Sequence, residues 1–449
     1  MARPAGSPTP GVEPPRPGGA APSPDGPAPS SHPRLPPGIT LPPTQTVVRL
    51  RRRPVGAIRL GRDLALDAAA PVPAPSARAP LLVRVLYVSV DPAMRGWMSA
   101  ARSYIPPVKL GAVMRAGGVA EVLAVHPSAA AGGGSSDSGA GSRGGSGTAG
   151  GGGGSGGDGG GGGGGGDNAV PAVGDLVSGT FGMCEFATAA VRDVEPLSWL
   201  PRHLSPALAL GTLGMTGLTA YFGLLRVGAP TGGRGETVLV SAAAGATGSV
   251  VCGIAKNVLG CRVVGVAGGA AKCAYVRDTL GVDAVVDYKA ARGSVGALTK
   301  ALAAACPDGV SIYFDNVGGP LLDAALRVLS RRGRVVLCGA ISQYNARERV
   351  SGGGPAEYVQ LLVKSARMEG FIVLDYAAEY AAARAALVRW YAEGKVGGRL
   401  EVVRGGIRAA PQALAMLFRG DNTGKVVVEV GDRWLRPALP GGGGAQAKL

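Results

Sequence analysis

The sequence predicts an α/β fold built around a doubly wound parallel sheet, for two reasons. Between Glu236 and Asp287, three short apolar strands alternate with two helical stretches, and a glycine turn follows the first strand. This order is typical of a βαβαβ unit. Two further apolar strands, at 310–315 and 333–338, each end in small or polar residues. Ligands of such sheets bind beyond the carboxyl ends of the strands, so we expect the functional site there.

The length of 449 residues suggests two to three domains once low-complexity segments are set aside. Residues 1–45 are mainly Pro, Gly, Ala and Ser, which predicts a disordered tail, and we expect a second such tail at 436–449. The stretch 128–167 is nearly all Gly, Ser and Ala, which predicts a flexible surface insertion. The rest of the chain is long enough for two domains that share an interface.

The composition argues against several classes of partner. A net charge of +16 would suit a nucleic-acid ligand, but the basic residues are spread along the chain and no aromatic residues interleave with the compact run Arg51–Arg53. We therefore expect no nucleic-acid partner. The six cysteines are scattered without a CxxC pair, and no apolar run is long enough to span a bilayer. A cytoplasmic protein with no membrane partner fits these features best.

The turn after the first strand carries a dinucleotide-binding pattern. Ala243, Gly245 and Gly248 occupy the places of the GxGxxG fingerprint, between the strand at 237–241 and a helix. Small residues there permit a tight turn, a close approach of the backbone to a pyrophosphate and close packing of helix on strand. Alanine in the first place weakens the match, whereas the strand before it and the helix after it strengthen it. This context predicts a Rossmann domain.

The residues that end the second strand favour NADPH over NADH. That region reads Val266-Ala267-Gly268-Gly269 and lacks the acidic side chain that would bind a ribose 2′-hydroxyl. Lys272 follows directly and would offer a positive charge to a 2′-phosphate. We also expect the turns that follow the later strands, at 316–319 and 339–342, to line the cofactor, although ordinary turns would have a similar composition.

The histidines and cysteines do not form a pattern that would bind zinc. The three histidines, His32, His126 and His203, lie in the tail, beside the insertion and in a proline-flanked connection. They yield no ligand pair with the scattered cysteines, so we predict no metal site. If hydride is transferred without a metal ion, the negative charge that develops on the carbonyl oxygen must be stabilised by a hydroxyl donor or by the cofactor. This favours the reduction of an electron-poor C=C bond or a quinone over the oxidation of an alcohol.

Seven motifs occur along the chain in the order LVRVLYVSVDPAMRGWM, SYIPPVKLGAVMRAGG, LGTLGMTGLTAYFGLL, AAAGATGSVV, IYFDNVGG, CGAISQYN and GDNTGK. In this order they resemble the zinc-independent medium-chain dehydrogenase/reductases of the leukotriene B4 dehydrogenase, prostaglandin reductase and alkenal double-bond reductase family, and the bacterial curcumin reductases. The resemblance extends from about Thr46 to Val430, apart from the glycine-rich insertion.

This resemblance implies NADPH-dependent reduction of the C=C bond of α,β-unsaturated ketones and aldehydes, with hydride added to the β-carbon. It implies that Tyr344 hydrogen-bonds the carbonyl oxygen as it becomes an enolate, although Tyr344 could equally be a cofactor-loop residue without a proton role. Tyr104 would line the substrate cleft. The cofactor contacts implied are Gly245, Ala246, Thr247, Gly248, Ser249, Lys272, Tyr288, Asn316, Cys338, Gly339, Ala340, Ile341, Ser342, Gln343, Tyr344, Phe371, Ile372, Val373 and Asn422.

The family's architecture implies a GroES-like β-rich catalytic domain at 46–204 that contains the insertion, a Rossmann NADPH-binding domain at 205–394 and a return to the catalytic domain at 395–435. A small-molecule enone or enal substrate and a homodimer are also implied. Two alternatives stay open. One is an NADPH quinone reductase of the same fold, and the other is a non-catalytic NADPH- or RNA-binding protein.

Overall fold

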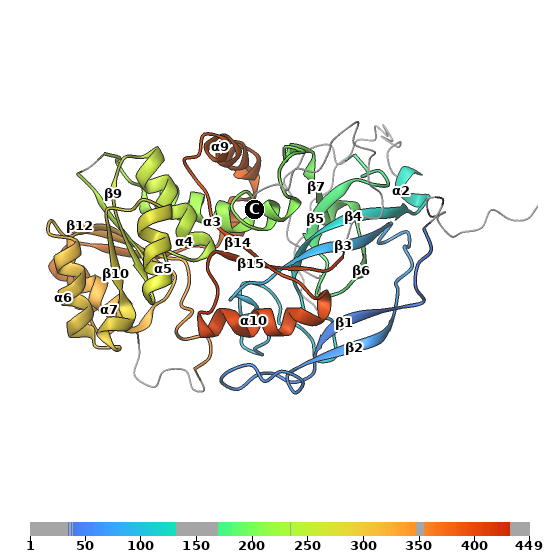
Figure 1. Ribbon diagram of the computed structural model, residues 1–449, viewed down its shortest axis with the longest axis horizontal. Helices are drawn as coiled ribbons and strands as arrows, with labels where there is room; N and C mark the ends of the chain where they lie inside the picture. Colours follow the sequence, from blue (N-terminus) through green and yellow to red (C-terminus); the bar gives the residue numbers. More distant parts are fainter. Residues whose placement is uncertain are drawn as a thin grey trace, which may run out of the picture.

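The computed structural model describes residues 35, 37, 39–131, 169–233, 235–346 and 354–431, and two sheet-based halves lie side by side (Figure 1). The predicted C-terminal tail and most of the predicted N-terminal tail and insertion fall outside these residues. Two parts of those segments are described. The first strand begins at Thr44, and the start of the insertion forms the helix α2 (Ser128–Ala131).

One half contains a six-stranded parallel sheet with the order β10-β9-β8-β11-β12-β13. The strands are β8 (Thr237–Val240), β9 (Arg262–Ala267), β10 (Ala284–Asp287), β11 (Val310–Asp315), β12 (Leu329–Leu337) and β13 (Arg367–Gly370). The order reverses between β8 and β11, which is the arrangement of a doubly wound sheet. The predicted fold class is confirmed.

The apolar strands of this sheet are buried on both faces. Along β8, Val238 and Val240 belong to the core on one face, whereas Leu239 belongs to the core on the other. Successive side chains of a strand point to opposite faces, so an uninterrupted apolar run suits a sheet that is covered on both sides.

Helices cover both faces of the sheet. The first core includes side chains from α3 (Met215–Phe222), α4 (Ala246–Gly253) and α9 (Tyr380–Ala392), and the second includes side chains from α6 (Val295–Ala305) and α7 (Gly319–Arg327). The short helix α5 (Ala270–Ala274) follows β9, and the short helix α8 (Val359–Val363) precedes β13. Helices α3, α4 and α5 continue as the π-helical turns η4 (Gly223–Gly228), η5 (Ile254–Val258) and η6 (Tyr275–Thr279).

The other half contains a sheet with the order β14-β15-β3-β4-β5-β7, in which β6 also pairs with β3, and a separate antiparallel pair β1-β2. The strands are β1 (Thr44–Leu50), β2 (Leu64–Pro71), β3 (Leu81–Ser89), β4 (Gly117–Val125), β5 (Leu176–Thr180), β6 (Phe186–Ala189), β7 (Val194–Pro196), β14 (Leu400–Val403) and β15 (Lys425–Glu429). Helices α1 (Met94–Trp97) and α10 (Ala410–Arg419) contribute to its core.

The C-terminal part of the chain connects the two halves. After α9 in the first half, β14 and β15 join the sheet of the second half. Just before β15, Gly424 forms a bridge with Gly245 of the glycine turn, and its N–H donates to the carbonyl of Ala244 at 2.7 Å. The next residue, Lys425, is buried and paired with Asp91. Within the described ranges, no helix has both the length and the apolar character needed to cross a bilayer.

Candidate active site

The glycine turn lies between β8 and α4. Gly245 precedes the helix with no side-chain cap, so the first N–H groups of α4 are available to an anion. Gly248 lies against the turn, where a Cβ would stand 2.3 Å from the carbonyl oxygen of Ala242. This backbone contact leaves room for glycine alone. The turn therefore fits a diphosphate that approaches the helix end through Ala246 and Thr247.

Ser249 differs from its neighbours in this turn. Its side chain is fully buried, and its hydroxyl donates to the carbonyl of Gly245 at 2.7 Å and to that of Ala243 at 3.2 Å. Its N–H also donates to Gly245. Because both donors are engaged inside the turn, Ser249 supports the shape of the turn.

A basic corner lies beyond β9. A Cβ on Gly268 would stand 2.5 Å from the ring of Tyr288, so this ring packs directly on the glycine backbone. Burial, and after it the charge of Lys289, lowers the pKa of Lys272. The carboxylates of Asp421 and Glu401 act on this pKa in the opposite direction. The corner therefore combines two ammonium groups with two carboxylates, and the two lysines are the groups that could bind a phosphate. Lys289, which sequence reasoning missed, lies beside the predicted Tyr288.

Asn316 lies at the end of β11, where the strand order reverses, and it joins this strand to the residue after β8. Its side-chain amide donates to the carbonyl of Ser241 at 2.8 Å, and its N–H donates to the Ser241 hydroxyl at the same distance. Beneath it, the buried carboxylate of Asp315 accepts hydrogen bonds from the N–H groups of Val317 and Gly318, both at 2.9 Å. The ends of β8 and β11 are thereby fixed to each other.

The loop after β12 contains the predicted segment Cys338–Tyr344. The N–H of Gly339 donates to the carbonyl of Asp315, and that of Ile341 donates to the carbonyl of Asn316. Ser342 adds two hydrogen bonds to the carbonyl of Val317, from its N–H and its hydroxyl. The loop is therefore fastened to the end of β11, and the exposed Ser342 and Gln343 follow at its outer side.

The hydroxyl of Tyr344 folds back onto its own loop, where its oxygen accepts the N–H of Ala340 at 3.2 Å. Its hydrogen is thus left to donate to another group. Burial raises the pKa of Tyr344, so the phenol keeps its proton at neutral pH. Burial, and after it Asp315, raises the pKa of Cys338 to about 12, so this thiol is protonated and is not a nucleophile.

The remaining predicted residues follow β13 or precede β15. Phe371 follows β13, and its ring lies 2.5 Å from the place of a Cβ on Gly223, while the carbonyl of Val373 accepts the Tyr380 hydroxyl at 3.0 Å. Ile372 is partly buried between Phe371 and Val373. Asn422 lies beside the glycine turn, because its amide donates to the carbonyl of Gly424.

Tyr104 comes from the other half of the molecule and is 51% exposed. Its hydroxyl oxygen accepts the indole N–H of Trp97 at 3.2 Å. The phenol of Tyr104 is also close enough to contribute to the raised pKa of Tyr344, after burial and the neighbouring Cys338. The two predicted tyrosines, which come from opposite halves, are therefore near enough to influence each other electrostatically.

Comparisons with known proteins identify the family. Residues 246–389 match the family model for zinc-binding dehydrogenases, and 47–134 match the N-terminal domain of oxidoreductases. The chain is 36% identical to the NADPH-dependent curcumin reductase of Escherichia coli over 78% of this chain and 87% of that protein. It is 40% identical to a tobacco 2-alkenal reductase (NADP(+)-dependent) over 58% and 77% of the two chains.

The crystal structure of CurA from Vibrio vulnificus in complex with NADPH matches 86% of this chain and 100% of CurA, with a TM-score of 0.70 and 36% identity. The chain belongs to the zinc-independent medium-chain dehydrogenase/reductase family. The predicted resemblance is confirmed. In the part of this reductase that the structure describes, no group of three His, Cys, Asp or Glu side chains could hold a metal ion.

Arg95 was not among the predicted site residues, although it lies within the quoted DPAMRGWM motif. It is buried, and its Nη2 donates to the carbonyls of Pro54 and Gly56 at 2.9 and 3.0 Å. Its Nε donates to the side-chain oxygen of Asn345 at 3.2 Å. Asn345 follows Tyr344, so Arg95 ties the β12 loop of the reductase to the opposite half.

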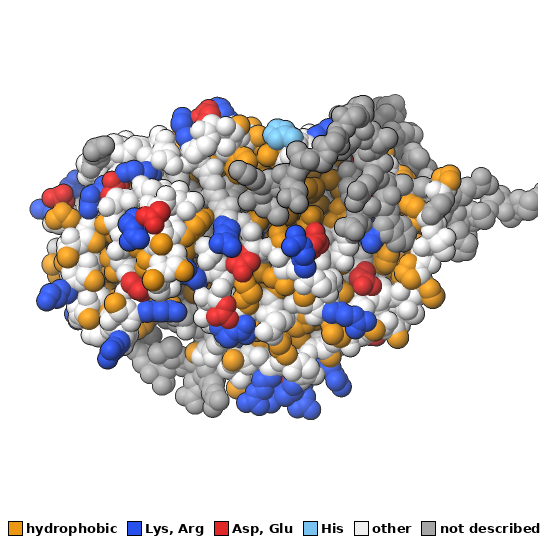
Figure 2. Space-filling view, in the orientation of Figure 1, with side chains coloured by type: hydrophobic (Ala, Val, Ile, Leu, Met, Phe, Trp, Pro, Cys, Tyr) orange, Lys and Arg blue, Asp and Glu red, His pale blue; other side chains and the backbone are white. Residues whose placement is uncertain are grey.

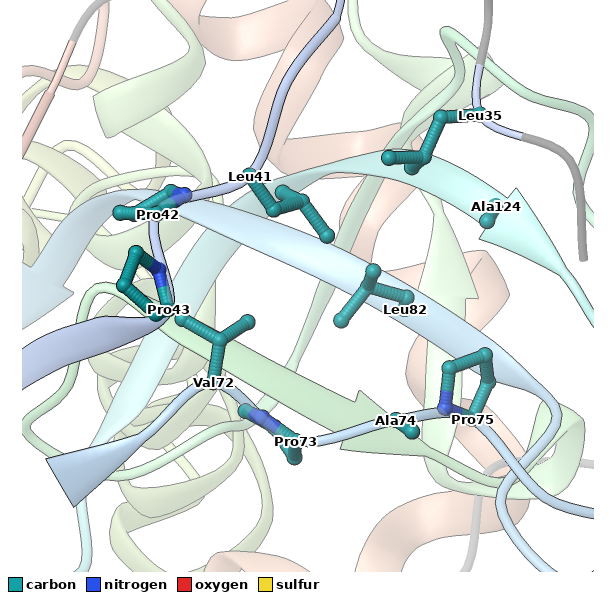
Figure 3. Close-up of a pocket in the computed structure, with 10 residues that line it drawn as sticks. All are labelled: Leu35, Leu41, Pro42, Pro43, Val72, Pro73, Ala74, Pro75, Leu82 and Ala124. Atoms are coloured by element: carbon teal, nitrogen blue, oxygen red, sulfur yellow. The ribbon is translucent and has the colours of Figure 1, made fainter. Parts of the chain in front are cut away.

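A separate pocket of about 250 Å³ lies away from these residues (Figure 3). It is an open pocket lined by side chains of β3 and β4, by Leu35 and 41–43, and by the 72–75 segment, and these side chains are all apolar. It contains none of the predicted site residues and no group that could act as an acid or a base. The candidate active site of the reductase therefore lies at the carboxyl ends of the parallel strands.

Proposed function

We propose that this reductase uses NADPH to reduce the C=C bond of α,β-unsaturated ketones and aldehydes. The observation that carries the proposal is the position of the Tyr344 hydroxyl. It lies on a loop fastened to the dinucleotide-binding strand ends and has a free hydrogen to donate. The similarity to an NADPH-dependent curcumin reductase and to a 2-alkenal reductase supports the same class of reaction.

NADPH would be held by residues from several strand ends. The N–H groups at the start of α4 would bind the diphosphate, and Lys272 with Tyr288 and Lys289 would bind the 2′-phosphate. Asn316, the 338–344 loop, 371–373 and Asn422 would enclose the rest. When bound, NADPH supplies the hydride that is added to the β-carbon of the substrate.

Tyr344 would stabilise the charge that develops on the substrate. As hydride reaches the β-carbon, electron density moves to the carbonyl oxygen, and a hydrogen bond from the phenol to that oxygen becomes stronger. Since the hydroxyl oxygen of Tyr344 accepts the N–H of Ala340, the hydroxyl hydrogen would be left to donate to the substrate. Protonation of the α-carbon then completes the saturated product. Tyr104 would form the opposite wall of the cleft.

The test is NADPH oxidation by the purified protein with an enone, an alkenal, a simple quinone and a saturated ketone, repeated with NADH. We expect turnover of the enone and the alkenal, with NADPH preferred. Turnover of the quinone alone would instead identify a quinone reductase. Tight NADPH binding without any turnover would identify a non-catalytic protein.

Lys272→Ala is expected to raise the KM for NADPH about tenfold or more and to change the KM for NADH less than about twofold. The ammonium group provides a point charge that only a 2′-phosphate would use, and tenfold corresponds to about 1.4 kcal/mol. Steady-state kinetics with both cofactors measures this. Lys300→Ala, an exposed lysine of α6, is the matched control. Equal losses for the two cofactors would contradict the assignment.

We also propose that two copies of the chain associate through β13 and α8. β13 is an edge strand of the six-stranded sheet, and α8 and the residue before it expose four apolar side chains, Tyr358, Val359, Leu362 and Val363. Arg367 lies 3.8 Å from Glu369 of its own chain, and if two β13 strands paired antiparallel about Met368 it would also lie opposite Glu369 of the other copy. This charge match favours a second copy as the partner.

Leu362→Glu should convert a dimer to a monomer, because Leu362 is 81% exposed and a charge there could not be buried between two copies. Light scattering coupled to size exclusion measures the mass. Leu66→Glu, at an exposed position of β2, should leave the mass unchanged. A wild-type protein that is already monomeric at micromolar concentration would reject this interface.

A further inference from the structure

The connection between β1 and β2 carries an exposed positive charge. Figure 2 shows Lys and Arg side chains gathered at the lower edge of the molecule, where this connection lies in Figure 1. Residues 51–62 contain five arginines and no Asp or Glu. Three of these arginines, Arg51, Arg52 and Arg59, have exposed side chains. The charge of this connection therefore faces outward.

Backbone hydrogen bonds bring two other segments to either side of Arg51. The N–H of Arg51 donates to the carbonyl of Asp63 at 2.8 Å, which places the turn at 59–62 on one side. The N–H of Gly111 donates to the carbonyl of Leu50 at 2.7 Å, which places the segment 109–111 on the other. Arg51 therefore lies between these two segments.

Each flanking segment adds an exposed leucine. Leu60, in the turn, is 42% exposed, and Leu110 is 56% exposed beside the exposed Lys109. Aliphatic side chains thus stand among positive charges on one surface. We call this the basic-apolar surface, and it consists of Arg51, Arg52, Arg59, Leu60, Lys109 and Leu110.

The charge of the basic-apolar surface is not neutralised within the part of the chain that the structure describes. None of its four basic side chains forms an ion pair with a described residue. The nearby carboxylates are engaged elsewhere, because Asp63 is buried and paired with Arg62, and Asp67 is paired with Arg49. The surface therefore remains available to an anionic partner.

We propose that the basic-apolar surface docks this protein on an anionic lipid membrane. The basic side chains would contact negatively charged headgroups, while Leu60 and Leu110 would insert among the upper parts of the acyl chains. A single-stranded nucleic acid would match the charge, but it stacks on aromatic side chains, and this surface offers leucines instead. The inference goes beyond the proposed function and does not depend on it.

The sequence-based expectation of no membrane partner rested on the lack of a segment that could span a bilayer. Docking at the surface of a membrane needs no such segment, because charge and a few inserted side chains supply the affinity. The docking surface also lies outside the candidate site, since none of its six residues is a predicted contact of cofactor or substrate. Membrane docking and reduction can therefore be tested separately.

The experiment measures sedimentation of the purified protein with vesicles of phosphatidylcholine alone and of phosphatidylcholine with about 30% phosphatidylserine. We expect binding to the anionic vesicles at low ionic strength and not to the neutral ones, and added salt should weaken it. Arg51→Ser/Arg52→Ser/Arg59→Ser should raise the dissociation constant for anionic vesicles at least about tenfold. Leu60→Ser/Leu110→Ser keeps the charge and should raise it about threefold or more, because no leucine would then insert.

Arg78→Ser/Arg202→Ser/Lys300→Ser is the matched control, because it removes the same charge from three exposed residues outside the basic-apolar surface. It should keep the wild-type affinity for anionic vesicles. Each variant should also keep the wild-type midpoint of thermal unfolding, which shows that it is folded.

Three results would overturn the proposal. The first is a wild-type protein that does not bind anionic vesicles. The second is an equal loss of affinity in the control variant, because the attraction would then come from the net charge of +16 as a whole. The third is unchanged affinity in the leucine variant, together with tighter binding of the wild type to a single-stranded RNA than to vesicles, which would identify a nucleic-acid surface.

Discussion

Gly248→Ala is expected to raise the dissociation constant for NADPH at least about a hundredfold, about 2.7 kcal/mol. The added methyl group would stand 2.3 Å from the carbonyl oxygen of Ala242 and 2.9 Å from its carbonyl carbon. A backbone cannot yield to such a contact without moving the start of α4. The N–H groups that would face the diphosphate would then lose their common direction.

Fluorescence titration with NADPH measures this effect, and thermal unfolding measures the accompanying loss of stability. Gly235→Ala is the matched control, because a Cβ at Gly235 meets no atom within 4 Å and the residue lies just before β8 in the same domain. Unchanged NADPH affinity in a folded Gly248→Ala protein would show that this turn is not the cofactor site.

The turn also shows why a sequence that matches the GxGxxG fingerprint only in part can still form the glycine turn. Ala243 replaces the first glycine of the fingerprint and is fully buried. Space for its methyl group comes from Gly265 in the adjacent strand β9, where a Cβ would lie 3.1 Å from the Cβ of Ala243. Alanine is tolerated at position 243 because glycine stands at position 265 in the paired strand. A linear motif contains no information about which strands pair.

The parallel sheet was predictable because its information is local. The continuous apolar runs of β8, β9 and β11 and the glycine turn each lie within a short segment, and buried parallel strands need no alternation. The end of the predicted N-terminal tail was less predictable. Leu41 packs on a small core that includes Leu82 and Phe186, although proline and glycine dominate the segment before it.

The directions of side chains and the contacts between the two halves could not be predicted from the sequence. Ser249 lies in the expected turn, yet its hydroxyl bonds inward, because an exposed or a buried rotamer fits the same motif. The hydrogen bond from Arg95 to Asn345 joins residues 250 positions apart in the chain. Lys289 reaches Lys272 only because β9 and β10 are neighbours in the sheet.

These contacts explain how the fold would position a hydroxyl for chemistry. Arg95 holds Asn345 from one half, while Asp315, Asn316 and Val317 hold the preceding loop from the other. Tyr344 lies between the two sets of bonds. A donor fixed in this way needs little reorganisation when charge develops on a substrate oxygen, which is the condition for efficient electrostatic stabilisation.

Tyr344→Phe is therefore expected to lower kcat roughly ten- to a thousandfold and to leave the dissociation constant for NADPH within about twofold of the wild type. The change removes one hydroxyl from a loop whose other bonds, from Gly339 and Ile341 to the end of β11, stay in place. Tyr391→Phe in α9 is the matched control and should keep the wild-type kcat.

The pH dependence of kcat provides a second measurement of the same role. Because burial raises the pKa of Tyr344 above the ordinary value of 10.0, the donating phenol persists at every pH below that value. Wild-type kcat should show no loss from this group between neutral pH and 10.0, and the loss should begin above it. Tyr344→Phe should lack this alkaline loss. If its kcat matched the wild type throughout, Tyr344 would be a cofactor-loop residue without a role in stabilising the enolate.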